Sequence, residues 1–163
     1  MEIDIENATI LIVDDTPANI DVLRELLRER YLLKVATNGQ RALEIVAGPA
    51  PPDLVLLDIM MPGMDGYEVC RRMKAAESTC HIPVIFVTAI DDIENEARGF
   101  EAGCVDYIIK PVSEPLLRAR VATHVRLSRQ DQLLQSLLHE RSAAESPLST
   151  LGDRPWPSTN QRT

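Results

Sequence analysis

The sequence of 163 residues has few aromatic side chains and no excess of positive charge. Aromatic residues make up 4% of the chain and hydrophobic residues 45%, so a core must consist mainly of Leu, Ile, Val and Ala. Lys and Arg number 17, Asp and Glu number 25, and the net charge is −8. Tight non-specific binding to nucleic acid depends on Lys and Arg at phosphates. The composition therefore predicts a globular protein that does not bind nucleic acid.

The sequence also lacks the segments that carry a chain into or across a membrane. No apolar run approaches the ~20 residues that a membrane-spanning helix needs. The start of the chain, MEIDIENA, is acidic and has no apolar signal-peptide core. The three cysteines, Cys70, Cys80 and Cys104, are widely spaced, which is typical of reduced thiols that pack as small hydrophobic groups. We therefore expect a cytoplasmic protein without a membrane partner.

Short apolar runs alternate with amphipathic segments over the first 125 residues. Pro17 suits the first turn of a helix, Asn38 can cap the next helix, and Gly103 can end a later one. Apolar strands that alternate with helices predict a parallel sheet covered on both faces, which is a doubly wound (βα)5 α/β fold. The five predicted strands are Thr9–Val13, Leu32–Ala36, 53–58, 82–89 and 105–110.

Polar side chains follow or end four of the predicted strands. Asp14 and Asp15 follow the first, Asp58 ends the third, Thr88 lies near the end of the fourth, and Lys110 ends the fifth. In a doubly wound sheet the ligand lies at the carboxyl ends of the strands. Three carboxylates at one edge repel each other without a cation, and oxygen ligands suit Mg²⁺. A carboxylate beside Mg²⁺ and an ammonium group can act as a nucleophile toward a phosphoryl group.

Four motifs together resemble the receiver domain of two-component response regulators. They are the acidic pair Asp14-Asp15, LLDIMMPGMDG around Asp58, VTA ending at Ala89, and DYIIKP ending at Pro111. Each motif is weak evidence alone, but the four fall in the right order at the right strand ends. The resemblance covers roughly residues 8–125. It implies a flavodoxin-like receiver fold and a phosphoprotein that receives its phosphoryl group from a histidine kinase or a phosphotransfer protein.

The resemblance also implies roles for individual residues at the phosphorylation site. Asp58 would be the phosphoacceptor. Asp15 would bind Mg²⁺ directly, Asp14 partly through water, and Asp58 and the main-chain carbonyl of Met60 would supply further ligands. Lys110 would contact the phosphoryl oxygens after transfer, and the peptide bond that follows it is expected to be cis.

The resemblance further implies a conformational switch. Thr88 would move toward the phosphoryl oxygens, and Tyr107 would swing inward as Thr88 moves. Alternatively, Tyr107 is simply a half-buried ring of the core. The surface changed by the switch would be formed by the helix expected over 91–102, the strand 105–110 and the last helix, which starts near Ser113. This surface is a candidate dimer interface.

Two apolar side chains are expected to influence the lifetime of the phosphoryl group on Asp58. Met60 lies two residues after Asp58, and Ile90 lies two residues after Thr88. Neither side chain can hydrogen-bond an attacking water, so we expect a phosphorylated state that lasts minutes or more. A Mg²⁺-dependent phosphatase with an aspartyl-phosphate intermediate would carry an acid in place of Met60. We therefore expect a phosphoacceptor with slow self-dephosphorylation and not an enzyme.

The last predicted helix continues beyond the receiver. An apolar pattern extends to about Arg141 and predicts a helical extension over 126–141, after a receiver domain over 1–125. Residues 142–163 are rich in Ser, Thr and Pro, which is typical of a disordered tail. The extension could form a short coiled coil in a homodimer, or it could fold back or fray. Its leucines are Leu127, Leu133, Leu134, Leu137 and Leu138.

The sequence does not identify the output domain or partner that the predicted receiver controls. No helix-turn-helix or catalytic motif follows the helical extension. In the receiver family, such extensions often lead into an enzyme of cyclic-dinucleotide turnover or another output domain. We expect signalling through protein–protein contact or dimerisation. The alternative is that the chain is the N-terminal receiver fragment of a larger regulator, for example one with cyclic di-GMP turnover.

Overall fold

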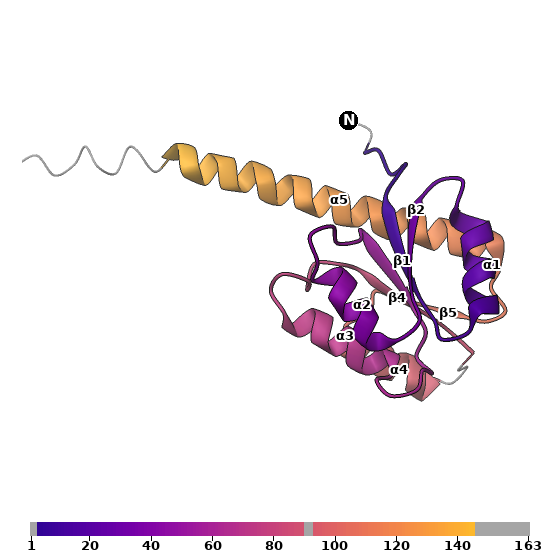
Figure 1. Ribbon diagram of the computed structural model, residues 1–163. Helices are drawn as coiled ribbons and strands as arrows, with labels where there is room; N and C mark the ends of the chain where they lie inside the picture. Colours follow the sequence, from indigo (N-terminus) through magenta and orange to yellow (C-terminus); the bar gives the residue numbers. More distant parts are fainter. Residues whose placement is uncertain (1–2, 90–92, 146–163) are drawn as a thin grey trace, which may run out of the picture. The chain divides into compact units, whose positions relative to one another are not determined.

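Five strands and five helices alternate along the residues that the computed structural model describes, 3–89 and 93–145 (Figure 1). The strands are β1 Thr9–Val13, β2 Leu32–Ala36, β3 Leu54–Leu57, β4 Val84–Thr88 and β5 Asp106–Ile109. The helices are α1 Pro17–Leu27, α2 Gly39–Val46, α3 Gly66–Ala75, α4 Ile93–Ala102 and α5 Glu114–Glu145.

The strands form one parallel sheet in the order β2-β1-β3-β4-β5. In the register, Val13 of β1 lies opposite Ala36 of β2 and Leu57 of β3. The chain therefore leaves β1 toward one edge of the sheet and returns to its other side at β3. This reversal is a topological switch point, where the carboxyl ends of β1 and β3 border a crevice. The predicted doubly wound fold is confirmed.

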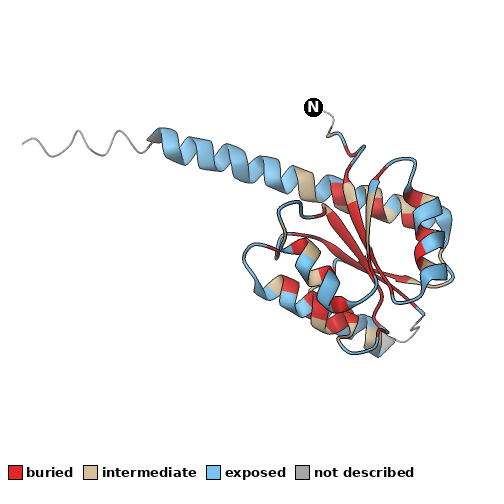
Figure 2. Ribbon diagram, viewed as in Figure 1, coloured by how far each residue is buried: buried red, intermediate tan, exposed pale blue. Residues whose placement is uncertain are grey.

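The sheet separates two hydrophobic cores. Ile10 and Ile12 of β1 point to the face covered by α1 and by the buried positions of α5, such as Val121. Leu11 and Val13 point to the other face, which α2, α3 and α4 cover. Alternate side chains of a strand lie on opposite faces, so a strand apolar at every position must be buried on both sides. Figure 2 shows the buried residues concentrated along the strands and the inner sides of the helices that cover them.

Several helix ends follow the local signals in the sequence. Helix α1 begins at Pro17, which occupies its first turn. The side chains of Asn38 and Asp65 accept main-chain N–H bonds at the start of α2 and α3. Gly103 follows α4 with a φ of +107°, a conformation that suits a residue without a Cβ atom. The Lys110-Pro111 peptide bond is cis, as expected.

Helix α5 continues to Glu145, past its predicted end near Arg141. Residues 142–145, which were expected to belong to a disordered tail, are therefore helical, and they include two alanines, the strongest helix former. The remainder of the predicted tail lies outside the described residues.

The chain divides into two compact units, Met1–Arg129 and Gln130–Thr163. The described part of the second unit is the helical segment 130–145, in which Leu133, Leu134, Leu137 and Leu138 are all exposed. No helix within 3–89 or 93–145 combines the length and apolar character needed to cross a lipid bilayer.

Candidate functional site

Three carboxylates converge at the carboxyl ends of β1 and β3. Asp14, Asp15 and Asp58 each place an oxygen within 4.8 Å of the others. The sheet fixes this arrangement, because the main-chain N–H of Asp58 donates to the carbonyl of Val13 at 2.9 Å. Asp14 is buried, Asp58 is 7% exposed, and Asp15 is exposed. The predicted acidic residues therefore lie together, with one of them open to solvent.

The side chain of Lys110 reaches this acidic group from the end of β5. Its Nζ atom lies 2.7 Å from Oδ2 of Asp14 and 3.5 Å from Oδ2 of Asp58. Its main-chain N–H donates to the carbonyl of Thr88 at 2.9 Å, which joins the ends of β4 and β5. Three carboxylates and one ammonium give a formal charge of −3 + 1 = −2. The site therefore has the charge and the oxygen atoms that a divalent cation requires.

Asp14 is held by hydrogen bonds through both of its carboxylate oxygens. Oδ1 accepts the main-chain N–H of Thr16 at 2.9 Å and the side-chain amide of Asn19 at 3.4 Å, while Oδ2 faces Lys110. Asn19 was not among the site residues predicted from the sequence. Its signal was a polar residue in the first turn of α1, one turn beyond the acidic pair. The contacts orient Asp14 and leave exposed Asp15 as the acid most accessible from solvent.

Burial is the main influence on the electrostatics of Asp58, and it raises the pKa of this carboxyl above its ordinary value. The neighbouring carboxylate of Asp14 acts in the same direction. The Lys110 ammonium, the main-chain N–H of Met60 at 3.4 Å and a hydrogen bond from Thr88 lower the pKa and oppose these effects. Asp58 is therefore a carboxylate whose charge is only partly compensated by the protein.

The loop after Asp58 folds back onto the main chain of the same residue. The N–H of Gly66 donates to the carbonyl of Ile59 at 2.9 Å. A Cβ atom on Gly66 would lie 2.3 Å from the carbonyl oxygen of Asp58, so a side chain has no room there. Gly63 adopts a φ of +79° in the same loop. The packing that makes Gly66 necessary could not be predicted from the motif LLDIMMPGMDG alone.

Met60 and Thr88 lie at opposite extremes of exposure. Met60 is 65% exposed, and its main-chain carbonyl remains a predicted metal ligand. Thr88 is fully buried at the end of β4. Ile90, which the lifetime prediction also uses, lies outside the described residues.

Tyr107 is a buried ring of the core, with 5% of its surface exposed. Its ring lies edge-on to that of Phe86, with 6.1 Å between the centroids. The ring thus points inward in this structure. Its movement in a switch remains a prediction.

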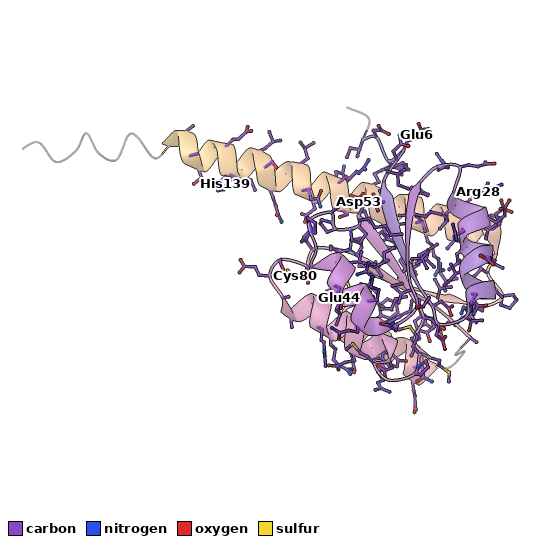
Figure 3. All side chains as sticks on the ribbon, viewed as in Figure 1. Glu6, Arg28, Glu44, Asp53, Cys80 and His139 are labelled. Carbon is purple, nitrogen blue, oxygen red and sulfur yellow. The ribbon has the colours of Figure 1, made fainter. Side chains whose placement is uncertain are left out.

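The cysteines divide into two buried thiols and one exposed thiol, and all three are free. Burial raises the pKa of Cys70 to about 11 and that of Cys104 to about 12, which makes both thiols unreactive at neutral pH. These two residues pack as small hydrophobic groups, as predicted. Cys80 differs, because it lies exposed in the connection between α3 and β4 (Figure 3).

Comparison with protein families and curated proteins identifies similar sequences. A family model described as the response regulator receiver domain matches residues 10–122. A Vibrio cholerae protein named "Probable cyclic di-GMP phosphodiesterase" is 51% identical over 131 residues, which cover 80% of this chain and 30% of that protein. Response regulator PleD of Caulobacter vibrioides is 40% identical over 139 residues, which cover 85% of this chain and 30% of PleD. The chain thus spans about a third of the length of these relatives.

Solved structures share the fold of this chain. The BeF3-activated N-terminal receiver domain of RstA from Klebsiella pneumoniae has a TM-score of 0.66 and 34% identity, and the match covers 72% of this chain and 98% of that domain. The receiver domain of Francisella response regulator 1452 has a TM-score of 0.69 and 28% identity, with coverage of 75% and 99%. The region matched by the family model contains every predicted site residue, from Asp14 to Lys110.

Proposed function

This chain belongs to the response regulator receiver family, and we propose that Asp58 is the residue on which it accepts a phosphoryl group. The observation that carries the proposal is the convergence of Asp14, Asp15 and Asp58 beside Lys110 at the carboxyl edge of the sheet. Receiver domains are phosphoacceptors and bind Mg²⁺ at an acidic pocket. The proposed donor is a histidine kinase or a phosphotransfer protein.

The proposed reaction is a transfer of a phosphoryl group from a phosphohistidine nitrogen to a carboxylate oxygen of Asp58. The P–N bond breaks as the P–O bond forms, and the departing imidazole nitrogen recovers its electron pair. Lys110 holds Asp14 and lies close enough to Asp58 to face the incoming phosphoryl oxygens with positive charge. Thr88 lies next to Asp58 at the end of β4 and supplies a hydroxyl for the same oxygens.

The acidic residues fit a hard divalent cation. Asp14, Asp15, Asp58 and the carbonyl of Met60 would hold Mg²⁺, because they offer oxygen ligands and the site carries a net formal charge of −2 (−3 + 1). When bound, Mg²⁺ would offset the negative charge on the transferring phosphoryl group. The main-chain bond from Asp58 to Val13 positions the nucleophilic carboxylate of Asp58, and the contacts of Thr16 and Asn19 orient Asp14, whether or not a phosphoryl donor is bound.

We propose that the signal leaves through the surface formed by α4, β5 and α5. Thr88 would move toward the phosphoryl oxygens, and the ring of Tyr107 would adjust to that movement, which links the site to β5 and α4. The support is that both side chains are buried and belong to neighbouring strands, β4 and β5, which pair in parallel. A buried pair of this kind responds to a displacement by repacking, because cores tolerate few voids.

Incubation with acetyl phosphate and Mg²⁺ tests the phosphoacceptor directly. Intact-mass spectrometry should show one added phosphoryl group in the wild-type chain and none in Asp58→Asn. Asp65→Asn is the matched control, because Asp65 lies in the same loop and Asn caps a helix as well as Asp does. Labelling of Asp58→Asn at the wild-type rate would refute the assignment of Asp58.

The phosphorylated state is proposed to be long-lived, because the side chain of Met60, two residues after Asp58, has no group that can hydrogen-bond an attacking water. After acetyl phosphate is removed, the phosphorylated chain should have a half-life of minutes or more. Intact-mass spectrometry measures this half-life as the loss of the added mass over time. A half-life of a few seconds would contradict this expectation. Continued release of phosphate over many turnovers would instead indicate a phosphatase.

A second copy of this chain is a proposed partner. The leucines of segment 130–145 support it, because Leu133, Leu134, Leu137 and Leu138 are between 43% and 65% exposed. In a helix, residues three and four positions apart lie on the same face. Leu133 and Leu137 are four positions apart, as are Leu134 and Leu138, and Leu134 and Leu137 are three apart, so the four leucines form one apolar surface. Dimerisation through this surface, through the α4-β5-α5 surface or through both would bring two receivers together.

The output of the signal is proposed to lie outside this chain's described residues. Because the chain spans 30% of the length of its V. cholerae and C. vibrioides relatives, we also propose that it can stand at the head of a larger regulator. The V. cholerae protein is named for cyclic di-GMP hydrolysis, and this activity would belong to the rest of that protein. Three free thiols support a cytoplasmic location.

A further inference from the structure

Three aromatic rings form a continuous row across the face of the sheet that α2, α3 and α4 cover. The centroid of Tyr67 lies 5.6 Å from that of Phe86, and the centroid of Phe86 lies 6.1 Å from that of Tyr107. Both pairs are edge-to-face, with interplanar angles of 65° and 64°, and all three residues are buried. One Trp, three Tyr and two Phe make six aromatic residues in the chain, so this row contains half of them.

Helix α4 rests on all three rings. The hydroxyl of Tyr67 donates to the main-chain carbonyl of Asn95 at 3.0 Å, and the guanidinium carbon of Arg98 lies 4.3 Å from the centroid of the same ring. A Cβ atom on Gly99 would lie 3.1 Å from the Phe86 ring and 3.3 Å from the Tyr107 ring. The absence of a side chain at Gly99 therefore lets the backbone of α4 lie directly against these two rings.

Tyr67 also lies next to the loop that carries the phosphoacceptor. It follows Gly66, whose missing Cβ would lie 2.3 Å from the carbonyl oxygen of Asp58. Tyr67 thus connects two elements: its main chain continues from the point where the loop touches Asp58, and its hydroxyl bonds to α4. This connection is separate from the one through Thr88 and Tyr107, because it passes through α3 and not through β5.

We propose that Tyr67 is a positioning residue that holds α4 in the arrangement of the unphosphorylated protein. This inference rests on the proposed function of Asp58. The bond from the Tyr67 hydroxyl to Asn95 and the stacking of Arg98 favour the present position of α4. In the proposed response to phosphorylation, α4 moves away from Tyr67 and this hydroxyl bond breaks, so removal of the hydroxyl makes the shifted arrangement more accessible. A ligand that binds the shifted arrangement then binds more tightly.

The substitution Tyr67→Phe removes the hydroxyl and keeps the ring. The carbonyl of Asn95 keeps its place in the helical hydrogen-bond ladder of α4. The side-chain oxygen of Asn95, which the hydroxyl also contacts at 3.4 Å, belongs to a residue that is only partly buried, so the substitution leaves no fully buried acceptor without a donor. Tyr31→Phe is the matched control. Tyr31 is buried on the opposite face of the sheet, and its hydroxyl has no hydrogen-bond partner among the residues that the structure describes.

The affinity for beryllofluoride in the presence of Mg²⁺ tests the proposal, with isothermal titration calorimetry as the readout. We expect Tyr67→Phe to bind beryllofluoride about two- to tenfold more tightly than wild type, since a hydrogen bond of ordinary strength shifts an equilibrium by that factor. Tyr31→Phe should match wild type, and the affinity for Mg²⁺ alone should be the same in all three proteins. Amide hydrogen exchange of α4 should be faster in Tyr67→Phe.

A purely structural role for Tyr67 would lower the melting temperature but would not tighten beryllofluoride binding. Unchanged or weaker binding by Tyr67→Phe would overturn the proposal. Failure of the wild-type chain and of Tyr31→Phe to bind beryllofluoride would instead overturn the proposed function of Asp58, and the role of Tyr67 with it.

Arg98→Met provides a second, independent variant, because Arg98 is exposed and its loss leaves the core intact. It should tighten beryllofluoride binding in the same direction and by a smaller factor. If Tyr67→Phe does not fold, an unchanged affinity in Arg98→Met overturns the proposal.

Discussion

The carboxyl edge of the sheet and the helical segment 130–145 are unusual in opposite ways, because one buries charged side chains and the other exposes apolar ones. At the edge of the sheet, Asp14 and Asp58 are charged groups that are buried. In the helical segment, Leu134 and Leu138 are apolar groups that are exposed. Each arrangement costs free energy by itself, because a buried charge loses hydration and an exposed leucine keeps its apolar surface in water. Both costs fall when a partner binds.

The kind of unfavourable free energy in each region indicates the kind of partner that the region binds. Buried carboxylates around one ammonium are expected to bind a cation and, beside it, a phosphoryl group. Exposed leucines on one side of a helix are expected to pack against another apolar surface, such as the same helix of a second copy. The buried site is the more specific of the two, because its oxygens have fixed positions, whereas an apolar stripe accepts any surface of similar shape.

Removal of Mg²⁺ should have the largest effect on the acidic site. EDTA should slow labelling by acetyl phosphate about 100-fold or more, since a metal ion supplies several kcal/mol of charge stabilisation in the transition state. Intact-mass spectrometry measures the rate, and added MgCl2 should restore it. Equal rates with and without EDTA would show that the acids do not act through a metal ion.

The second prediction concerns the loop that supports Asp58. Gly66→Ala should cost about 3 kcal/mol of unfolding free energy and should also slow labelling, because the new Cβ would press on the main chain of Asp58. Gly63→Ala is the control in the same loop. No atom lies within 4 Å of the position of its Cβ, so it should cost roughly 1 kcal/mol, through its positive φ alone, and leave labelling unchanged. Urea denaturation and intact-mass labelling measure the two effects.

The third prediction concerns a substitution that disrupts the apolar surface of the helical segment. Leu134→Lys should weaken a dimer of the phosphorylated chain at least tenfold, because two buried leucines, one from each copy, would be lost from the interface. Sedimentation equilibrium measures the dissociation constant. Gln135→Lys, at the neighbouring exposed position, should dimerise like wild type. Loss of dimer in both variants would point to charge and not to the leucine surface, and labelling of Asp58 should be normal in both.

The predictability of the structure from the sequence also differs between regions. The bounds of β1 and β2 match the prediction, because each apolar run ends in polar or turn-forming residues. Strand β4 begins at Val84 and not at 82, since Pro83 has no N–H to donate to a neighbouring strand. Helix α5 is longer than predicted, because composition suggested a tail where two alanines continue the helix.

The acidic site was predictable because a parallel sheet brings the carboxyl ends of its strands to one edge. Its support was not predictable. Asn19 beside Asp14, the close approach of Gly66 to Asp58, and the Tyr67 bond to Asn95 each depend on where side chains from separate elements meet. No local pattern in the sequence encodes such contacts.

The smallest expected effect is a pH dependence of stability without Mg²⁺. The pKa of Asp58 is raised in the folded chain above its ordinary value of 3.8, mainly by burial. A group of this kind stabilises the fold at pH below 3.8, and this contribution is lost as the pH rises through the raised pKa. The unfolding free energy of wild type should therefore fall relative to that of Asp58→Asn as the pH rises from about 4 to 7. A constant difference over this range would contradict the pKa shift.

We propose that the buried acids are arranged for a cation, and a Mg²⁺ titration of the unfolding free energy at pH 7 tests this proposal. Without Mg²⁺, Asp58→Asn should be more stable than wild type, because the buried charge is gone. With Mg²⁺ at 100 times its dissociation constant, wild type should gain about 2.7 kcal/mol and Asp58→Asn much less, which closes or reverses the gap. A wild-type stability that does not change with Mg²⁺ would contradict the proposed cation site.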